Sequence, residues 1–185
     1  MIDDVLADAS RRMDRSVEAA RHEFNTIRTG RASVALLDRI QVSAYGTKMP
    51  LNQVATISVP EPRLLSITPF DKSTIRDIER AIQESDLGLT PSNDGQVVRL
   101  PIPQLTEERR KELVRQVRHL AEEGRVAARN VRRDAIHQMK EMEKKGEVGS
   151  DDVHRAEDRL QKLTDEHTTA IDAALKAKEA EIMEV

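Results

Sequence analysis

The sequence predicts a mainly α-helical protein with an α+β insertion: a long three-helix bundle plus a small β/α/β domain, forming an L-shaped two-domain molecule. Two observations support this fold class. Apolar residues recur at helical spacing over both ends of the chain, whereas all seven prolines lie between residues 31 and 104. The first helical stretch also finds no long partner helix until after residue 104, so the middle segment must fold separately.

The first predicted helix covers residues 3–28. Val5, Ala9, Met13 and Phe24 belong to a series of apolar residues at steps of three and four, with charged residues between them. Gly30 follows as the expected C-cap. A helix of this length extends about 40 Å, and a narrow apolar stripe of that length needs partner helices to bury it.

The middle segment, residues 31–104, has the texture of a small α+β domain. Short β-prone runs at 40–45, 56–59, 64–68 and 97–100 alternate with prolines and turn residues. One helix is predicted over residues 73–85, with Asp71 or Ser73 as its cap. We expect this domain to be an insertion between the first and second long helices.

Two further long helices follow. An apolar stripe begins after Pro103 and runs to a break at residues 145–149, and a second stripe begins with Ser150 and Asp151 as cap candidates. The bundle domain is therefore predicted from residues 1–30 and 105–185, with hinges near 30–32 and 101–105. The predicted hinge residues are Gly30, Arg31, Ala32, Pro101, Pro103, Gln104 and Leu105.

Composition excludes several functions. The chain has no Cys and no Trp, and Phe24, Tyr45 and Phe70 are its only aromatic residues, so thiolate metal sites, disulfides and aromatic stacking platforms are not expected. The five histidines stand singly, without an HExxH pair, and no phosphate-binding Gly-rich loop occurs. We predict no catalytic residues, no metal and no cofactor.

The N-terminal sequence lacks the basic start of a signal peptide, and no apolar run approaches the roughly 20 residues that span a bilayer. We expect a cytoplasmic protein with no membrane partner. Because the bundle can close within one chain, we also expect a monomer.

Eight cations of the second long helix fall on one side of it. At 100° per residue in an ideal helix, they lie within about 60° of the line through Lys111. We call this set the cationic face: Lys111, Arg115, Arg118, Arg125, Arg129, Arg132, Arg133 and Lys140. The apolar residues of the same helix centre on the opposite side, so packing of the bundle would turn the cationic face to solvent.

Pairing with acidic residues one turn away is the ordinary fate of such charges. No Asp or Glu occurs between Gly124 and Arg133, however, and Arg125, Arg129 and Arg133 are like charges four residues apart. We therefore expect the cationic face to be open to an anionic partner. Guanidinium groups suit bidentate phosphate contacts, and without aromatic residues to stack unpaired bases the expected partner is folded RNA, read by backbone and shape.

Several motifs support a family resemblance. They are FNTIRTGRASVALL at 24–37, PLNQ at 50–53, SDLGL at 85–89, NDG at 93–95, PQLTEERRK at 103–111, RNVRRDA at 129–135, QKLT at 161–164 and KEAEIMEV at 178–185. With these motifs the chain resembles the bacterial ribosome recycling factor family over essentially its full length. The resemblance implies a three-helix bundle that carries an inserted α+β domain on a two-strand hinge.

The resemblance also implies a task. Such a protein enters the post-termination ribosome, lays its bundle on large-subunit rRNA and, with elongation factor G, separates the subunits, while the partner hydrolyses the GTP. Transferred by position, the rRNA-binding residues are Arg132, Arg129, Arg133, Arg28, Arg31 and Arg110, and Arg125 joins them through its place on the cationic face. The inserted domain would present the surface that elongation factor G pushes, and bending at the hinge would transmit that push.

Two other interpretations remain open at this point. A coiled-coil, chaperone-like protein-binding module would need apolar stripes that stay exposed after the bundle closes. A metal-dependent nuclease or hydrolase would use the acidic pairs Glu107-Glu108 and Asp151-Asp152, although each pair opens a predicted helix, where negative charge complements the helix dipole.

Overall fold

The computed structural model describes residues 1–184 and divides the chain into two compact units. The helical unit comprises Met1–Thr29 and Glu107–Glu184, and the inserted unit comprises Gly30–Thr106. Val185, the last residue of the predicted bundle domain, lies outside the described residues. The predicted fold class, mainly helical with a small α+β insertion, is confirmed.

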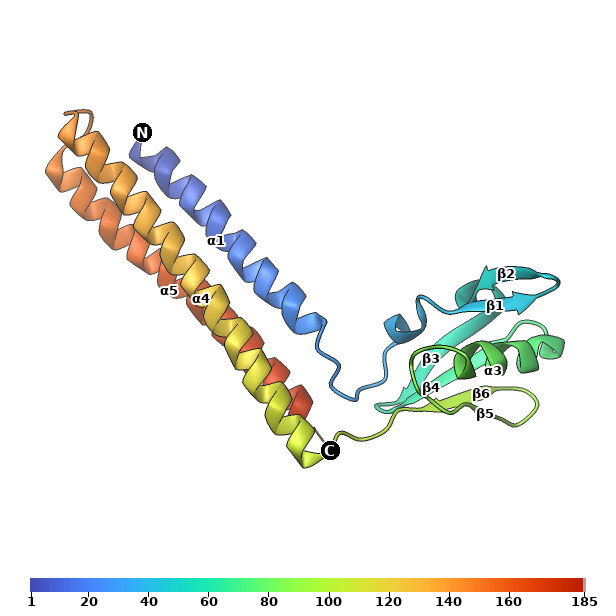
Figure 1. The fold of residues 1–185 in the computed structure, drawn as a ribbon. Helices are drawn as coiled ribbons and strands as arrows, with labels where there is room; N and C mark the ends of the chain where they lie inside the picture. Colours follow the sequence, from blue (N-terminus) through green and yellow to red (C-terminus); the bar gives the residue numbers. More distant parts are fainter. Residues whose placement is uncertain (185) are drawn as a thin grey trace. The chain divides into compact units, whose positions relative to one another are not determined.

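Three long helices form the helical unit: α1 (Ile2–Asn25), α4 (Glu107–Lys144) and α5 (Ser150–Met183). They lie side by side along their length (Figure 1). The predicted stripes supply the core, because one row of apolar residues on each helix is buried against the other two. These rows include Met13 of α1, Val117 and Met139 of α4, and Leu160 and Ile171 of α5.

Small residues let the three helices approach closely at the level of Gly124. Gly124 of α4 is buried, and a Cβ atom added to it would lie 3.1 Å from Cβ of Ala20 and 3.2 Å from Cδ1 of Ile171. Both distances are well below the ordinary carbon–carbon contact of about 3.5–4.0 Å. The absence of a side chain at Gly124 therefore sets the spacing of α1, α4 and α5 at this level.

Two predicted helix ends are wrong. Helix α1 ends at Asn25, not near Gly30, because Thr26 closes the last turn: its backbone N–H and its hydroxyl both donate to the carbonyl of Glu23, at 3.1 and 2.6 Å. At the start of α5 the cap position is Gly149, while Ser150 and Asp151 already lie inside the helix and their side chains do not cap it.

The inserted unit contains two small antiparallel sheets (Figure 1). Strands β1 (Gln41–Ala44) and β2 (Thr47–Pro50) form a hairpin. The second sheet has the order β3-β4-β6-β5 and consists of β3 (Ala55–Glu61), β4 (Leu64–Pro69), β5 (Ser92–Asn93) and β6 (Val98–Pro101). Its register pairs Ile67 with Val98 and Leu65 with Leu100.

Helix α3 (Ile75–Gln83) completes the core of the inserted unit. Ile75, Ile78 and Ile82 are buried with Ile67 and Leu100 in one cluster. As predicted, Asp71 caps this region, since its side chain accepts a hydrogen bond from the Ser73 N–H at 2.9 Å at the start of the 3₁₀ turn η2 (Lys72–Thr74). The four β-prone runs are strands, whereas β2, β5, the short helix α2 (Leu51–Val54) and the 3₁₀ turn η1 (Val34–Leu37) were not predicted.

Both ends of the inserted unit are tied to one hairpin turn. The Ala32 N–H donates to the Pro62 carbonyl at 2.7 Å, and the Ile102 N–H donates to the Arg63 carbonyl at 2.8 Å. Gly30 adopts a positive φ of 78°, and a Cβ atom there would lie 3.3 Å from Cγ of Leu105. The chain therefore enters and leaves this unit at neighbouring points.

Candidate RNA-binding face

Helix α4 fixes the direction of the cationic face because its opposite side is buried. Leu113, Val117, Val131, Ala135 and Met139 pack into the core of the helical unit. The cations between them are exposed or half-buried: Lys111, Arg115, Arg118, Arg133 and Lys140 are exposed, and Arg125, Arg129 and Arg132 are half-buried. The predicted orientation of the cationic face toward solvent is confirmed.

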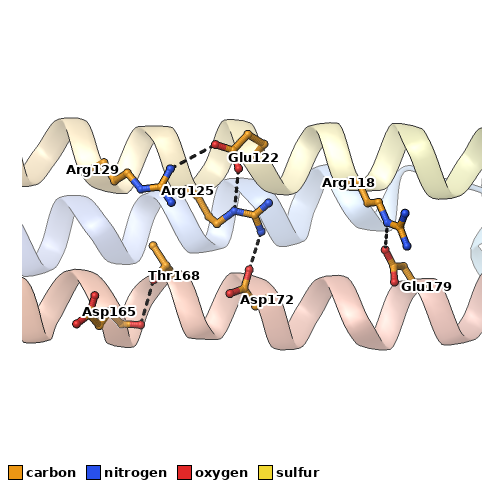
Figure 2. Close-up of polar contacts among 8 residues, drawn as sticks. All are labelled: Arg118, Glu122, Arg125, Arg129, Asp165, Thr168, Asp172 and Glu179. Atoms are coloured by element: carbon orange, nitrogen blue, oxygen red, sulfur yellow. Dashed lines mark hydrogen bonds and ion pairs between the residues drawn. The ribbon is translucent and has the colours of Figure 1, made fainter.

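Carboxylates nevertheless hold three of these arginines, which lie between residues 118 and 129 of α4 (Figure 2). Arg118 donates to Glu179 of α5 at 2.7 Å. Arg125 donates to Glu122 at 3.0 Å and to Asp172 of α5 at 2.6 Å. Arg129 reaches the other oxygen of Glu122 at 3.3 Å, as Figure 2 also shows. The expectation that this face lacks acidic partners is wrong for these three residues, because α5 supplies Glu179 and Asp172 across the helix–helix contact and Glu122 of α4 itself bonds Arg125 and Arg129.

The cluster around Glu122 and Arg125 shifts the pKa values of both groups. The hydrogen bond from Arg125 is the main cause that lowers the pKa of Glu122, and the nearby charge of Arg129 adds to it. Burial disfavours the charge of Arg125, but its bonds to Glu122 and Asp172 outweigh that penalty and raise its pKa. Both partners are therefore held in their charged forms, and their charges offset each other.

Of the other five cations on the face, four keep their charge uncompensated. The fifth, Lys111, forms an ion pair with Glu107 at 3.4 Å. Arg115, Arg132, Arg133 and Lys140 form no ion pair with any carboxylate in the described part of the chain. Arg132 donates instead to the side-chain oxygen of Gln161 on α5, and Arg133 donates weakly to Asn130 at 3.5 Å. Three of these four open cations, Arg132, Arg133 and Lys140, lie in the C-terminal half of α4.

The remaining predicted RNA-binding residues lie in different parts of the fold. Arg28 is exposed just after α1, in the helical unit, whereas Arg31 is exposed at the start of the inserted unit. Arg110 is half-buried in the first turn of α4, and its Nε has no hydrogen-bond partner. Arg28, Arg110 and Arg132 therefore belong to one unit, and Arg31 belongs to the other.

Sequence reasoning missed the α5 residues that contact the cationic face, namely Gln161, Asp172 and Glu179. A signal for them was present: residues 107–144, which form α4, carry a net charge of +3, and residues 150–183, which form α5, carry −4. Two neighbouring helices with such opposite charges are expected to form ion pairs across their contact. The charge count alone does not show which arginine meets a carboxylate and which meets an amide.

Two exposed aromatic residues on the inserted unit were also not singled out. Tyr45 and Phe70 are 67% and 69% exposed. The Tyr45 hydroxyl donates to Asp71 at 2.5 Å, which raises the pKa of Tyr45 and lowers that of Asp71. Tyr45 also has a positive φ of 54°, since it sits in the tight turn between β1 and β2 with Gly46.

Within residues 1–184, no group of three or more His, Asp or Glu side chains is arranged to hold a metal ion. His167, the most enclosed histidine in an ion pair, bridges α5 and α1 through the Leu163 carbonyl and Asp14, at 2.6 and 2.7 Å. No helix in this range combines the length and apolar character needed to cross a membrane.

Comparison with known proteins identifies the family. Residues 20–183 match the family model described as "Ribosome recycling factor". The chain belongs to the ribosome recycling factor family. It is 62% identical over 180 residues to the ribosome-recycling factor of Rubrobacter xylanophilus, a match that covers 97% of each chain. It is 57% identical to the ribosome-recycling factor of Halalkalibacterium halodurans over the full length of both.

Solved structures of ribosome recycling factors share the fold. A solution structure of a ribosome recycling factor aligns with a TM-score of 0.71 and 43% identity, covering 100% of this chain and 98% of that one. A second neighbour aligns with a TM-score of 0.62 and 44% identity over the full length of both chains. It comes from a study of the T. thermophilus ribosome recycling factor and the E. coli elongation factor G bound to the E. coli post-termination complex.

Proposed function

We propose that this protein recycles ribosomes after translation termination. In this proposal the helical unit binds large-subunit rRNA, elongation factor G acts on the inserted unit, and the two together split the ribosome into subunits. Family membership supports the task, and the neighbour studied with elongation factor G on a post-termination complex supports the partner. The chain makes and breaks no covalent bond in this role, and GTP hydrolysis belongs to elongation factor G.

The open cations of α4 support the RNA contact most directly. Arg132, Arg133 and Lys140 project from a rigid helix whose other side is buried, so their positions are set by the core. Uncompensated cations at fixed positions bind phosphates with release of counterions from the RNA. A stiff helical unit held in this way would occupy space and compete with contacts between the subunits.

The ion pairs refine the predicted set of RNA-binding residues. Arg132 and Arg133 remain as principal phosphate contacts, and Lys140 joins them. Arg125, held by two carboxylates, has a mainly structural role, because a phosphate would have to displace both of them. Arg129 has one carboxylate partner, Glu122 at 3.3 Å, so it is intermediate between the phosphate-contacting residues and the structural Arg125.

The linkers support a hinge in a narrower form than the predicted one. Ala32 and Ile102 are hydrogen-bonded to the turn at Pro62 and Arg63, and Pro101 is the last residue of β6. Ala32 and Pro101 therefore belong to the inserted unit itself. Thr29 donates to Glu181 of α5 at 3.0 Å and so belongs to the helical unit. Bending is expected at residues 30–31 and 103–106, where the chain passes from one unit to the other, and would let one protein contact both rRNA and elongation factor G as the ribosome changes state.

Binding to purified large ribosomal subunits over a series of salt concentrations tests this proposal. The affinity should fall linearly on a log–log plot, and Arg132→Ala should weaken binding and reduce the slope by roughly one unit. Arg21→Ala is a matched control, since Arg21 is an exposed arginine of α1 paired with Glu18. Equal effects of the two variants, or binding that does not respond to salt, would contradict the proposal.

No observation favours the chaperone-like alternative. A client-binding module needs an exposed apolar stripe, whereas the stripes of α1, α4 and α5 bury one another. Within residues 1–184, the large apolar side chains exposed on the helical unit are Met1, Val126 and Met183, on different helices or helix ends. They form no continuous stripe along the bundle.

A further inference from the structure

Arg132 differs from its neighbours on the cationic face in the chemistry of its partner on α5. Arg118 and Arg125 each meet a carboxylate of α5, Glu179 and Asp172. Arg132 meets the neutral amide of Gln161. A carboxylate both orients a guanidinium and offsets its charge, whereas an amide oxygen orients it and leaves the full charge available.

The Gln161 amide is itself held in one orientation. Its nitrogen donates to the Asp165 carboxylate at 2.9 Å, one turn further along α5, so its oxygen faces Arg132. The Asp165 backbone is in turn part of the helix and accepts a hydrogen bond from the Thr168 hydroxyl at 3.2 Å, as drawn in Figure 2. Asp165 therefore holds Gln161, and Gln161 holds the Arg132 guanidinium, each by a hydrogen bond. The negative charge of this network lies on Asp165, which does not bond Arg132 itself.

The backbone positions of Arg132 and Gln161 are fixed by the core next to them. Val131 and Leu160, the residues immediately before Arg132 and Gln161, are buried in the same apolar cluster. The Nε atom of Arg132 is also buried and has no hydrogen-bond partner, so the contact of this guanidinium with the protein runs through Gln161. Without Gln161 the side chain would have more rotamers and no directed contact.

We propose that Gln161 is a positioning residue for RNA binding: it orients the Arg132 guanidinium toward phosphate without neutralising it. This inference rests on the proposed rRNA-binding function of the cationic face and assigns a role to a residue outside α4. It also explains why the α5 partner at this position is an amide, although α5 supplies carboxylates to Arg118 and Arg125.

Two substitutions separate orientation from charge. Gln161→Glu places a carboxylate against Arg132, so binding to large ribosomal subunits should weaken about tenfold at 0.1 M salt and the salt slope should fall by roughly one unit. Gln161→Met keeps the length of the side chain but removes the acceptor, so binding should weaken by roughly two- to tenfold through the freed side chain while the slope stays unchanged. Gln138→Glu, the same charge change at an exposed position of α4, should bind like the wild type.

A double variant keeps the test informative if Gln161→Glu also loosens the bundle. When Gln161 acts through Arg132, Arg132→Ala/Gln161→Glu binds no more weakly than Arg132→Ala alone. The inference would be overturned if the loss of affinity in the double variant equalled the product of the two single losses. It would also be overturned if Gln161→Glu kept the affinity and salt slope of the wild type. If Arg132→Ala itself binds like the wild type, the proposed function fails; if Arg132→Ala is weak and Gln161→Glu is normal, only the role of Gln161 fails.

Discussion

Arg125 provides a sharp test of the distinction between paired and open cations. Replacement of Arg125 by Met keeps most of the aliphatic stem and removes the guanidinium, together with its bonds to Glu122 and Asp172 at 3.0 and 2.6 Å. The Arg125 side chain is only 20% exposed, while the two carboxylates are 51% and 57% exposed. Both carboxylates can therefore regain water after the substitution.

This geometry sets the expected magnitude. Ion pairs whose acidic partners are exposed contribute roughly 0.2–1 kcal/mol each, so Arg125→Met should lower the free energy of unfolding by about 1 kcal/mol at neutral pH. The part of this contribution that comes from the Glu122 pair depends on ionised Glu122, whose pKa is lowered in the folded protein. It is therefore present above the ordinary glutamate value of 4.5 and is lost as the pH falls through the lower folded value.

Urea unfolding followed by helical circular dichroism, from pH 7 to pH 3, measures this effect. The difference between the wild type and Arg125→Met should be constant near neutrality and shrink on acidification. Affinity for large ribosomal subunits and its salt slope should stay close to the wild-type values, because Arg125 contributes no open charge. If Arg125→Met keeps the wild-type free energy of unfolding but lowers the salt slope of binding by one unit, the structural role of Arg125 is refuted and Arg125 is instead an RNA-binding residue.

Three further predictions concern the core of the helical unit and one turn of the inserted unit. Gly124→Val should lower the free energy of unfolding by about 2 kcal/mol or more, since its side chain would overlap Ala20 and Ile171; an unchanged urea midpoint would show that the helices can separate freely. Met139→Ala, at a fully buried site, should cost roughly 2–5 kcal/mol in the same assay, and a loss below 1 kcal/mol would mean that the bundle collapses around the cavity. Asp94→Ala should speed amide hydrogen exchange between β5 and β6 at neutral pH, since Asp94 accepts hydrogen bonds from the N–H groups of residues 96 and 97 and from Arg99. These bonds lower the pKa of Asp94, so the difference in exchange rate between the wild type and the variant should persist down to about pH 4 and shrink below it. Equal exchange rates at pH 7 would contradict this role.

The main elements of the fold follow from periodicity, but their ends do not. The stripes of α1, α4 and α5 are long enough that a few unfavourable residues do not hide the pattern. The end of α1 depends on local hydrogen bonds: the backbone N–H and the hydroxyl of Thr26 both bond back to the Glu23 carbonyl and close the helix before the stronger statistical signal at Gly30. Strands β2 and β5 were missed because they are short and mostly exposed, and pairing with a neighbouring strand defines them rather than their own composition.

The side of α4 that carries the candidate site could be predicted from the sequence, but the pairing of its cations with carboxylates could not. The side of α4 that faces water follows from the helical repeat of one segment and is confirmed. Two of its counter-charges, Asp172 and Glu179, come from α5, and whether Arg125 faces Asp172 or Arg132 faces Gln161 depends on the relative register of two packed helices. Register between helices is a tertiary property that the pattern of one helix does not contain.

The helical unit is built from two separate segments of the chain, and this affects how it folds during synthesis. Helix α1 is made first, but its buried face, including Met13 and Phe24, packs against α4 and α5, and Ile182 near the end of α5 is fully buried. The inserted unit has its own apolar cluster and can collapse while the later helices are still being translated. A nascent chain thus carries an unpaired amphipathic helix until its final segment emerges, and that interval is when aggregation or capture by a chaperone is most favoured.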